Sequence, residues 1–279
     1  MKKISRRSFL AAAGLSVAAL ALTACGGSAS SVASSVASSA ASSAAASTSA
    51  AAGELTTVEA GKLTMATNAA FPPYEMTTDA GDFEGIDIET AQAIADKLGL
   101  ELQIDDMDFD AALLSVQQGK ADIVMAGVTV TDERKAVMDF SDSYATGIQS
   151  IIVPEGSDIA SPDDLADKKI GTQRGTTGYI YCSDDFGDEN VVAYDDGLTA
   201  VQALNNGQVD AVVIDNAPAQ EFVAANPGLK ILDTSYAEED YAIGMAKGSS
   251  LEDAVNAALE ELKADGTLQS IVDKYITAE

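Results

Sequence analysis

Three predicted strands in the sequence are followed by polar residues that are able to hold a charged ligand. Residues 123–126 are apolar and lead to Gly127, Thr129 and Arg134. We predict that this run is a buried parallel strand, whose carboxyl end delivers these residues to a ligand crevice. Gly127 allows close approach to the backbone, Thr129 offers a hydroxyl, and the planar guanidinium of Arg134 suits a carboxylate. The alternative is that residues 131–134 only start a helix on which Arg134 is exposed.

Two further segments repeat this arrangement. Residues 169–178 predict a strand, a glycine-containing turn and a helix that starts near Thr176, whose free backbone N–H groups can bind an anion. The segment lacks the Gly-Lys-Ser/Thr of a nucleotide-binding loop, and an ordinary Thr-capped helix is the alternative. Residues 211–214 are apolar and precede Asp215, which places a carboxylate at another strand end. The alternative here is that Asp215 caps the helix that starts near Pro218.

Taken together, these residues describe a site for a zwitterion. Arg134 and the helix start near Thr176 would hold a carboxylate. Asp215, Thr129 and a carbonyl near Gly127 would hold an ammonium group. Because burying either charge without a partner costs several kcal/mol, a closed cleft must supply both partners together.

Strands and helices alternate along the rest of the chain, as a parallel sheet covered by helices requires. The predicted strands are 62–67, 100–104, 121–126, 147–153, 169–172, 191–194, 211–214 and 241–246, and the main predicted helices are 88–98, 109–118, 198–205 and 251–262. The order restarts after residue 147, which favours two α/β lobes. We therefore predict an α/β fold with a mostly parallel sheet in each lobe and a cleft between the lobes.

The composition excludes several classes of function. The 279 residues include 16 Lys+Arg and 44 Asp+Glu, a net charge of −28, which repels nucleic acid and anionic lipid headgroups. Histidine is absent, which removes Ser-His-Asp and Cys-His nucleophiles and the usual zinc sites. Asp106, Asp108 and Asp110 alternate, but a calcium loop starting there would need Gly and Glu where the chain has Ala111 and Gln117. We expect no metal, no cofactor and no nucleic acid partner.

The first 25 residues predict an exported lipoprotein. A basic start that includes Arg6 and Arg7 precedes residues 9–24, an uncharged run shorter than the roughly 20 residues of a membrane span. The run ends in Leu22-Thr23-Ala24-Cys25-Gly26, which resembles the bacterial lipobox. The resemblance implies cleavage before Cys25 and anchoring by fatty acids such as palmitate on that cysteine. The alternatives are an ordinary signal peptide and, for the export route, the twin-arginine pathway instead of the general one.

Several short motifs follow one another along the body of the chain. They are Ala70-Phe71-Pro72-Pro73-Tyr74-Glu75, Phe83-Glu84-Gly85-Ile86-Asp87-Ile88, Met107-Asp108-Phe109, Ala126-Gly127-Val128-Thr129, Thr131-Asp132-Glu133-Arg134, Phe140-Ser141, Gly175-Thr176-Thr177, and Asp210 with Asp215. In this order they resemble the polar amino acid-binding proteins of bacterial ABC importers (extracellular solute-binding proteins, family 3). The resemblance covers roughly residues 61–276.

The resemblance implies a type II periplasmic-binding fold, in which two hinge strands join the lobes and the cleft closes on the ligand. The hinges would lie near residues 144–148 and 239–244. The expected organisation is a signal peptide over 1–25, a disordered Ser/Ala-rich tether over 26–53, the first part of lobe 1 over 54–146, lobe 2 over 147–240, and the second part of lobe 1 over 241–279. With Cys25 lipidated we expect no disulfide, and we expect Cys182 to be a small buried residue or an idle thiol.

The resemblance also implies roles for the polar residues of the predicted site. Arg134 would grip the ligand's α-carboxylate together with the amides of Thr129 and Thr177. Asp215 would grip the α-ammonium group together with the Gly127 carbonyl and the Thr129 hydroxyl.

Five more residues bear on the ligand's side chain. Phe71 and Phe109 resemble aromatic walls, contributing on the order of 1–3 kcal/mol by stacking and burial, with plain core packing as the alternative. Asn68 and Gln173 would make the side-chain end of the pocket polar but uncharged, which favours a glutamine-like neutral ligand. Arg174, if it turned inward, would instead make an acidic ligand plausible.

The function implied is that of a monomeric receptor and not an enzyme. It would capture a polar L-amino acid at the outer face of the cytoplasmic membrane and deliver it to an ABC permease with its ATPase subunits. An enzyme on the same fold, a dehydratase or a murein-cleaving domain, is the alternative. Glu75 is its only nearby candidate acid, and the cleft offers no His or Lys.

Overall fold

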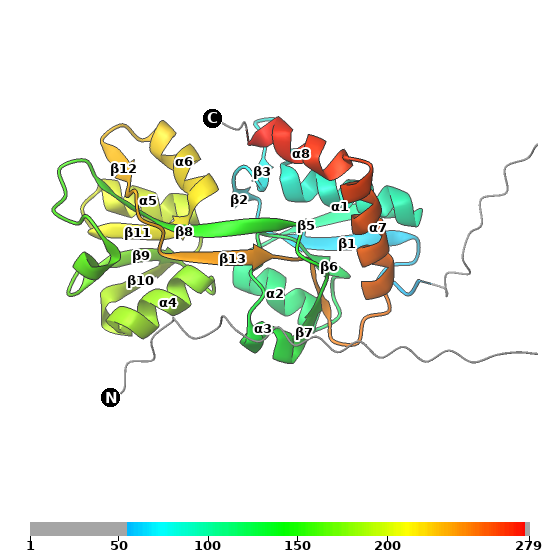
Figure 1. Ribbon diagram of the computed structural model, residues 1–279. Helices are drawn as coiled ribbons and strands as arrows, with labels where there is room; N and C mark the ends of the chain where they lie inside the picture. Colours follow the sequence, from blue (N-terminus) through cyan, green and yellow to red (C-terminus); the bar gives the residue numbers. More distant parts are fainter. Residues whose placement is uncertain (1–54, 277–279) are drawn as a thin grey trace, which may run out of the picture. The chain divides into compact units, whose positions relative to one another are not determined.

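Two α/β lobes, each with its own sheet, make up the computed structural model, which describes residues 55–276 (Figure 1). All of the described residues belong to a single compact unit. The predicted signal peptide, Cys25 and the tether lie outside the described residues. Within residues 55–276, every helix is too short or too polar to traverse a lipid bilayer.

The first sheet combines the N-terminal half of the body with one strand from the C-terminal part. Its order is β5 (Glu101–Asp106), β1 (Lys62–Thr67), β6 (Ile123–Val124), β14 (Gly244–Ala246) and β7 (Met138–Phe140). Strand β1 is parallel to both β5 and β6, whereas β14 is antiparallel to its two neighbours. A small sheet of β2 (Ala70–Phe71), β3 (Glu75–Thr77) and β4 (Phe83–Glu84) accompanies it.

The second sheet repeats the same plan. Its order is β10 (Val191–Tyr194), β9 (Ile170–Gln173), β11 (Ala211–Asp215), β8 (Ala145–Pro154) and β12 (Leu229–Ile231), with β13 (Ala237–Tyr241) also paired to β8. The first three strands are parallel, and β8 is antiparallel to β11. In both sheets the parallel strands therefore end at one edge, where ligands of open α/β sheets bind.

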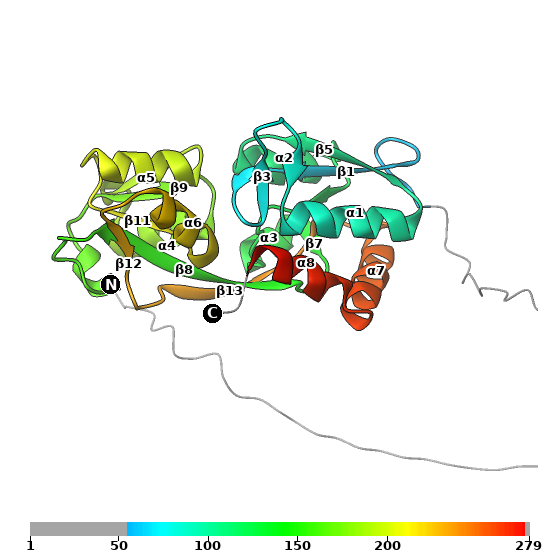
Figure 2. The same ribbon diagram turned by 90° about the horizontal axis from the view of Figure 1, so that it is seen from above.

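Helices cover both faces of each sheet (Figures 1 and 2). In the first lobe, α1 (Ile86–Leu98), α7 (Glu252–Ala264) and α8 (Thr267–Tyr275) share one core cluster, and α2 (Phe109–Gln117) packs in another. Neighbouring residues Met65 and Ala66 of β1 belong to these two different clusters, as alternation along a strand requires. In the second lobe, α5 (Gly197–Asn205) and α6 (Asn216–Ala225) lie opposite α4 (Thr177–Phe186), which carries the buried Cys182.

Helix α1 illustrates how local sequence defines an element. Its predicted stripe includes Ile88, Ala91 and Ala95, and all three side chains are buried. The helix ends at Gly99, which adopts the left-handed conformation with φ 70° and donates its N–H to the carbonyls of Ala95 and Asp96. Glycine accepts this conformation without steric cost, which explains the sharp stop.

Strands β8 and β13 pair side by side along the path between the two lobes (Figure 1). Residue Gly147 pairs with Glu239, and the ring of Tyr241 lies against Gly147 so closely that a Cβ there would be 2.3 Å from the ring. The predicted single strand over residues 241–246 is wrong, because β13 ends at Tyr241 and β14 begins at Gly244 in the other sheet. Residues 242 and 243 are apolar and buried, so the sequence shows no polar break at this change of sheet.

Candidate functional site

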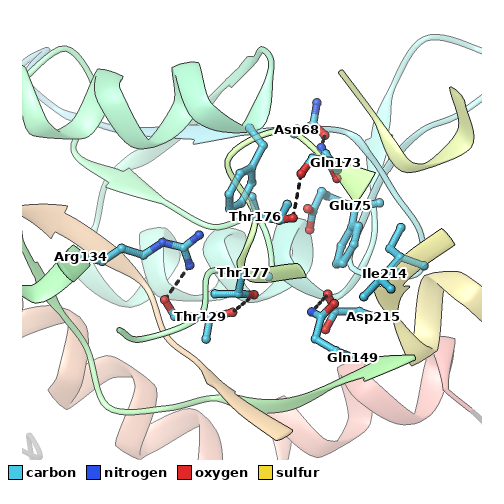
Figure 3. A pocket seen from close by; sticks show the side chains of 15 residues that line it. Asn68, Glu75, Thr129, Arg134, Gln149, Gln173, Thr176, Thr177, Ile214 and Asp215 are labelled. Atoms are coloured by element: carbon cyan, nitrogen blue, oxygen red, sulfur yellow. Dashed lines mark hydrogen bonds between the residues drawn. The ribbon is translucent and has the colours of Figure 1, made fainter. Parts of the chain in front are cut away.

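A pocket lies where the carboxyl ends of the two sheets face each other (Figure 3). It is lined by Asn68, Phe71, Glu75, Phe109, Ala126, Gly127, Thr129, Arg134, Gln149, Gln173, Thr176, Thr177, Val213, Ile214 and Asp215. All ten residues predicted to bind the ligand are in this set. Their contact with a ligand stays a prediction, but the fold brings them from five separated segments to one place.

Arg134 is held at the pocket by both lobes. It lies on α3 (Asp132–Val137), where the Thr131 hydroxyl caps the helix by accepting the Arg134 N–H at 3.2 Å. Its guanidinium donates to the carbonyl oxygens of Thr129 at 2.8 Å and Gly175 at 3.2 Å, and it lies 5.4 Å from the centre of the Phe109 ring. The side chain is only 8 % exposed, so the alternative of a solvent-exposed arginine is wrong.

The guanidinium keeps capacity for a ligand. Each terminal nitrogen of an arginine carries two N–H groups, and each here uses one of them on a backbone carbonyl. Burial lowers the pKa of Arg134, and the charges of Glu239 and Asp215 oppose that effect. Arginine remains protonated in proteins, so this buried cation is available to a carboxylate.

The start of α4 borders the same pocket. The Thr176 hydroxyl accepts the Tyr179 N–H at 3.3 Å and donates to the Gln173 carbonyl at 2.8 Å. The Thr177 hydroxyl lies 3.4 Å from the Thr129 hydroxyl of the other lobe. Thr176 therefore caps α4, as the alternative of an ordinary Thr-capped helix predicted, and it also lines the pocket.

Asp215 ends strand β11 and points into the pocket without capping α6. No cap hydrogen bond from its side chain is present, so that alternative is wrong. Its carboxylate instead accepts from the Gln149 amide at 2.8 Å and from the Tyr241 hydroxyl. Burial, followed by the charge of Glu239, raises the pKa of Asp215 well above its usual range, while Gln149 and Arg134 act in the opposite direction.

Two residues beside Asp215 were not predicted for the site. Gln149 and its neighbour Ser150 are buried polar residues next to the apolar end of β8, and this polar interruption is a signal that sequence reading can detect. Glu239 is buried on β13 between the exposed Glu238 and Asp240. Three acidic residues in a row suggest a solvated turn, so nothing in the sequence distinguishes the middle one.

At the opposite end of the pocket, the two predicted amides meet. The Gln173 side chain donates to the Asn68 side-chain oxygen at 2.8 Å, and Asn68 donates to the Met107 carbonyl at 3.0 Å. Arg174 does not line the pocket but reaches Asp195 at 3.3 Å with half of its side chain exposed. The condition for an acidic ligand, an inward Arg174, is therefore not met.

The aromatic residues serve the pocket and the core together. Phe71 and Phe109 both line the pocket, and each also belongs to a hydrophobic core cluster. The adjacent Gly127 has φ +54°, and a Cβ there would lie 2.9 Å from the Phe71 ring and 3.3 Å from the Tyr241 ring. Only glycine fits between these rings in this conformation.

A buried pair of carboxyl groups lies at the base of the pocket. Glu75, on β3, is fully buried and next to Asp87, whose carboxylate accepts from the Gly127 N–H at 3.0 Å and the Tyr144 hydroxyl at 2.8 Å. Burial raises the pKa of Asp87 to about 6 and that of Glu75 well above its usual range. Neither Glu75 oxygen has a hydrogen-bond partner among the described residues, and burial next to the charge of Asp87 favours the protonated form of Glu75. Glu75 thus forms a pair with a second buried acid and is not a lone acid.

The chain is similar in sequence to known proteins. Residues 63–278 match the family model described as bacterial extracellular solute-binding proteins, family 3. A probable histidine-binding protein of Neisseria gonorrhoeae is 33 % identical over 276 residues, covering 96 % of this chain and 95 % of that protein.

Solved structures agree on the fold. The arginine-, lysine-, histidine-binding protein ArtJ of Geobacillus stearothermophilus matches with a TM-score of 0.75 and 34 % identity, over 78 % of this chain and 96 % of that chain. An ancestral arginine-binding protein bound to glutamine matches with a TM-score of 0.75 and 42 % identity, over 78 % of this chain and 99 % of that chain. The predicted two-lobed α/β fold of the type II periplasmic-binding class is therefore confirmed.

Proposed function

Because the chain belongs to the bacterial extracellular solute-binding proteins of family 3, we propose that it captures a polar L-amino acid and delivers it to an ABC importer. Relatives of the chain are named for the amino acids they bind, among them histidine, cystine, arginine and glutamine, and these four are named as binding proteins. The proposal therefore concerns which ligand this chain binds and where it acts.

One observation carries the proposal. Arg134 and Asp215 enter the pocket from opposite sides, and each is only 8 % exposed (Figure 3). A buried guanidinium and a buried carboxyl group on one pocket match the two ends of an α-amino acid. Each ligand charge then meets a group that is already removed from water, which strengthens the interaction.

Closure of the cleft would follow from the way the lobes are joined. Strands β8 and β13 run between them, and Arg134 and the Asn68–Gln173 contact connect the lobes across the pocket. We propose that β8 and β13 act as hinges and that the ligand stabilises the closed arrangement by touching both lobes.

For the side chain, a neutral polar group of the glutamine type suits the pocket best. The amides of Asn68 and Gln173 offer uncharged hydrogen-bonding groups at 2.8 Å from each other. Glu75, when it holds the proton of its pair with Asp87, is neutral and able to donate to an amide oxygen. No charged side chain of the described residues complements an acidic ligand at this end.

The place of action is proposed from residues that precede the described part. The motif ending at Cys25 supports a lipid anchor, with the body on the outer face of the cytoplasmic membrane. There the protein would act as a monomer and hand its amino acid to a permease with its ATPase subunits. Mass spectrometry of the protein from membranes, with Cys25→Ser as the control, tests the anchor.

A thermal-shift screen of the purified protein with the twenty L-amino acids tests the ligand. At about a hundred times its Kd, a ligand adds about 2.7 kcal/mol of stability. We expect glutamine to give the largest shift. No shift with any amino acid would contradict the proposed function, and larger shifts with arginine or histidine would contradict only the proposed side-chain preference.

A further inference from the structure

A buried carboxylate lies next to Asp215, at the end of the pocket that would hold the ligand's ammonium group, and it does not line the pocket itself. Glu239, on strand β13, has only 6 % of its surface exposed. It contacts Thr129 and Gln149, which do line the pocket. Its Oε2 accepts from the Thr129 hydroxyl at 3.1 Å and from the Gln149 amide at 3.0 Å. Its Oε1 is buried without a donor among the described residues. Such a costly group calls for a reason.

Glu239 fixes the direction of the Thr129 hydrogen bond. A hydroxyl has one proton, and here Glu239, which is acceptor-only when ionised, takes it. In the 3.4 Å contact with Thr177, Thr129 is then left as the acceptor. The oxygen of Thr129 therefore presents lone pairs to the pocket instead of a proton.

Glu239 also fixes the Gln149 side chain. One amide nitrogen donates to Asp215 at 2.8 Å and to Glu239 at 3.0 Å, which uses both of its protons. A flipped amide would turn its oxygen toward two carboxylates, so this orientation is the only favourable one. The two acids share one donor, and no N–H of Gln149 remains for a ligand.

The result is an end of the pocket with acceptors only. Asp215, Thr129 and Gly127 line this end of the pocket. The protons of Thr129 and Gln149 that could have opposed an incoming donor are directed to Glu239 and Asp215. An ammonium group has three protons to give and a positive charge. A hydroxyl has one proton and no charge, so it gains much less here.

We propose that Glu239 is a positioning residue for the ligand's ammonium group, which makes this end of the pocket a cage of acceptors by orienting Thr129 and Gln149. The inference rests on the proposed amino acid binding and explains how the site selects the amino group. Glu239 acts through its two neighbours and does not need to touch the ligand.

The test compares ligands that differ only in this group. L-Glutamine and L-arginine are each paired with the 2-hydroxy acid of the same side chain, and Kd is measured by calorimetry for the wild type and for Glu239→Gln. In Glu239→Gln we expect the ratio of Kd for the hydroxy acid to Kd for the amino acid to fall by about tenfold or more, because the carboxylate that orients Thr129 and Gln149 is lost. Glu238→Gln, an exposed change on the same strand, should leave the preference unaltered.

A variant cycle gives a second readout if the hydroxy acids bind too weakly to measure. Thr129→Val removes the hydroxyl that Glu239 orients, so Glu239→Gln should weaken amino acid binding much less in that background than alone. Thermal unfolding without ligand checks that each variant folds.

The outcomes separate the two proposals. A wild type that binds no amino acid contradicts both. If Glu239→Gln weakens amino and hydroxy acids equally, or if its effect adds fully to that of Thr129→Val, Glu239 only supports the closed structure and the inference is wrong.

Discussion

Replacing Arg134 with methionine tests the carboxylate end of the site most directly. Methionine has a similar length and no charge, so the change Arg134→Met removes the guanidinium while leaving an apolar chain against Phe109. The carbonyls of Thr129 and Gly175 lose their shared donor as well. We expect a large loss of amino acid affinity with a smaller loss of stability.

The size of the loss follows from the burial of Arg134. With 8 % exposure, the guanidinium is already desolvated before the ligand arrives. A pair of unit charges about 4 Å apart gains about 4 kcal/mol at an effective dielectric constant of about 20. A single hydrogen bond to a charged group gives about 1.5–3 kcal/mol. A loss at the upper end of these figures, about 3 to 4 kcal/mol, is expected because a charge pair and its hydrogen bonds are lost together. Since about 1.4 kcal/mol is tenfold in Kd, the affinity should fall by a factor of about 100 to 1,000.

Ligand-induced stabilisation provides the assay. At a concentration of about a hundred times the wild-type Kd, the amino acid adds about 2.7 kcal/mol, and after a hundredfold loss of affinity it adds only about 0.4 kcal/mol. Lys135→Met, an exposed change on the same helix, should behave like the wild type. If Arg134→Met still gains more than about 2 kcal/mol, the guanidinium does not hold the ligand and the assignment is refuted.

Three further predictions concern the rest of the pocket. Phe71→Ala should weaken binding about tenfold and change the ranking of ligands, because the ring lines the pocket, and it should also lower stability, because the ring belongs to the core. Calorimetry with several amino acids measures the ranking, and an unchanged ranking would contradict the prediction. Asn68→Asp keeps an oxygen for the Gln173 amide but adds a charge, so the ratio of Kd for glutamine to Kd for arginine should rise about tenfold, and a ratio that stays level would count against a side-chain role. Burial raises the pKa of Asp87 to about 6 from 3.8, so the folded state binds this proton more tightly and the free energy of unfolding should decrease by about 2 kcal/mol as the pH rises from about 4 to about 7. Urea unfolding should show a shallower decrease in Glu75→Gln, whose amide is able to donate to Asp87 without a shared proton; equal pH dependence in the two proteins would exclude the coupled pair.

The sequence was informative where a feature depends on neighbouring residues. The stop of α1 at Gly99 and the cap of α3 at Thr131 are local events with local signals. The polar residues at the ends of β6, β9 and β11 could be predicted to converge, because parallel strands present their carboxyl ends at one edge. The order of the motifs along the chain also indicated that two lobes are joined by hinge strands, which no single segment reveals.

Other features depend on residues far apart in the chain. The apolar run after Tyr241 gave no sign of the change from one sheet to the other, since burial looks the same in both. Glu75 and Asp87 are separated by a strand and a helix start, and only the packing of β3 beside α1 shows that the two acids are buried next to each other.

The chain alone therefore determined the class of fold, the family and the opposite charges required by a zwitterion, because periodicity, motif order and residue type are written along it. Only the tertiary structure decided which of three consecutive acids is buried behind the site, where Arg174 points, and which hydrogen bonds Thr129 and Gln149 have left to give. The physical reason is that hydrogen-bond direction and desolvation arise from partners brought together by folding, and sequence neighbours do not supply those partners.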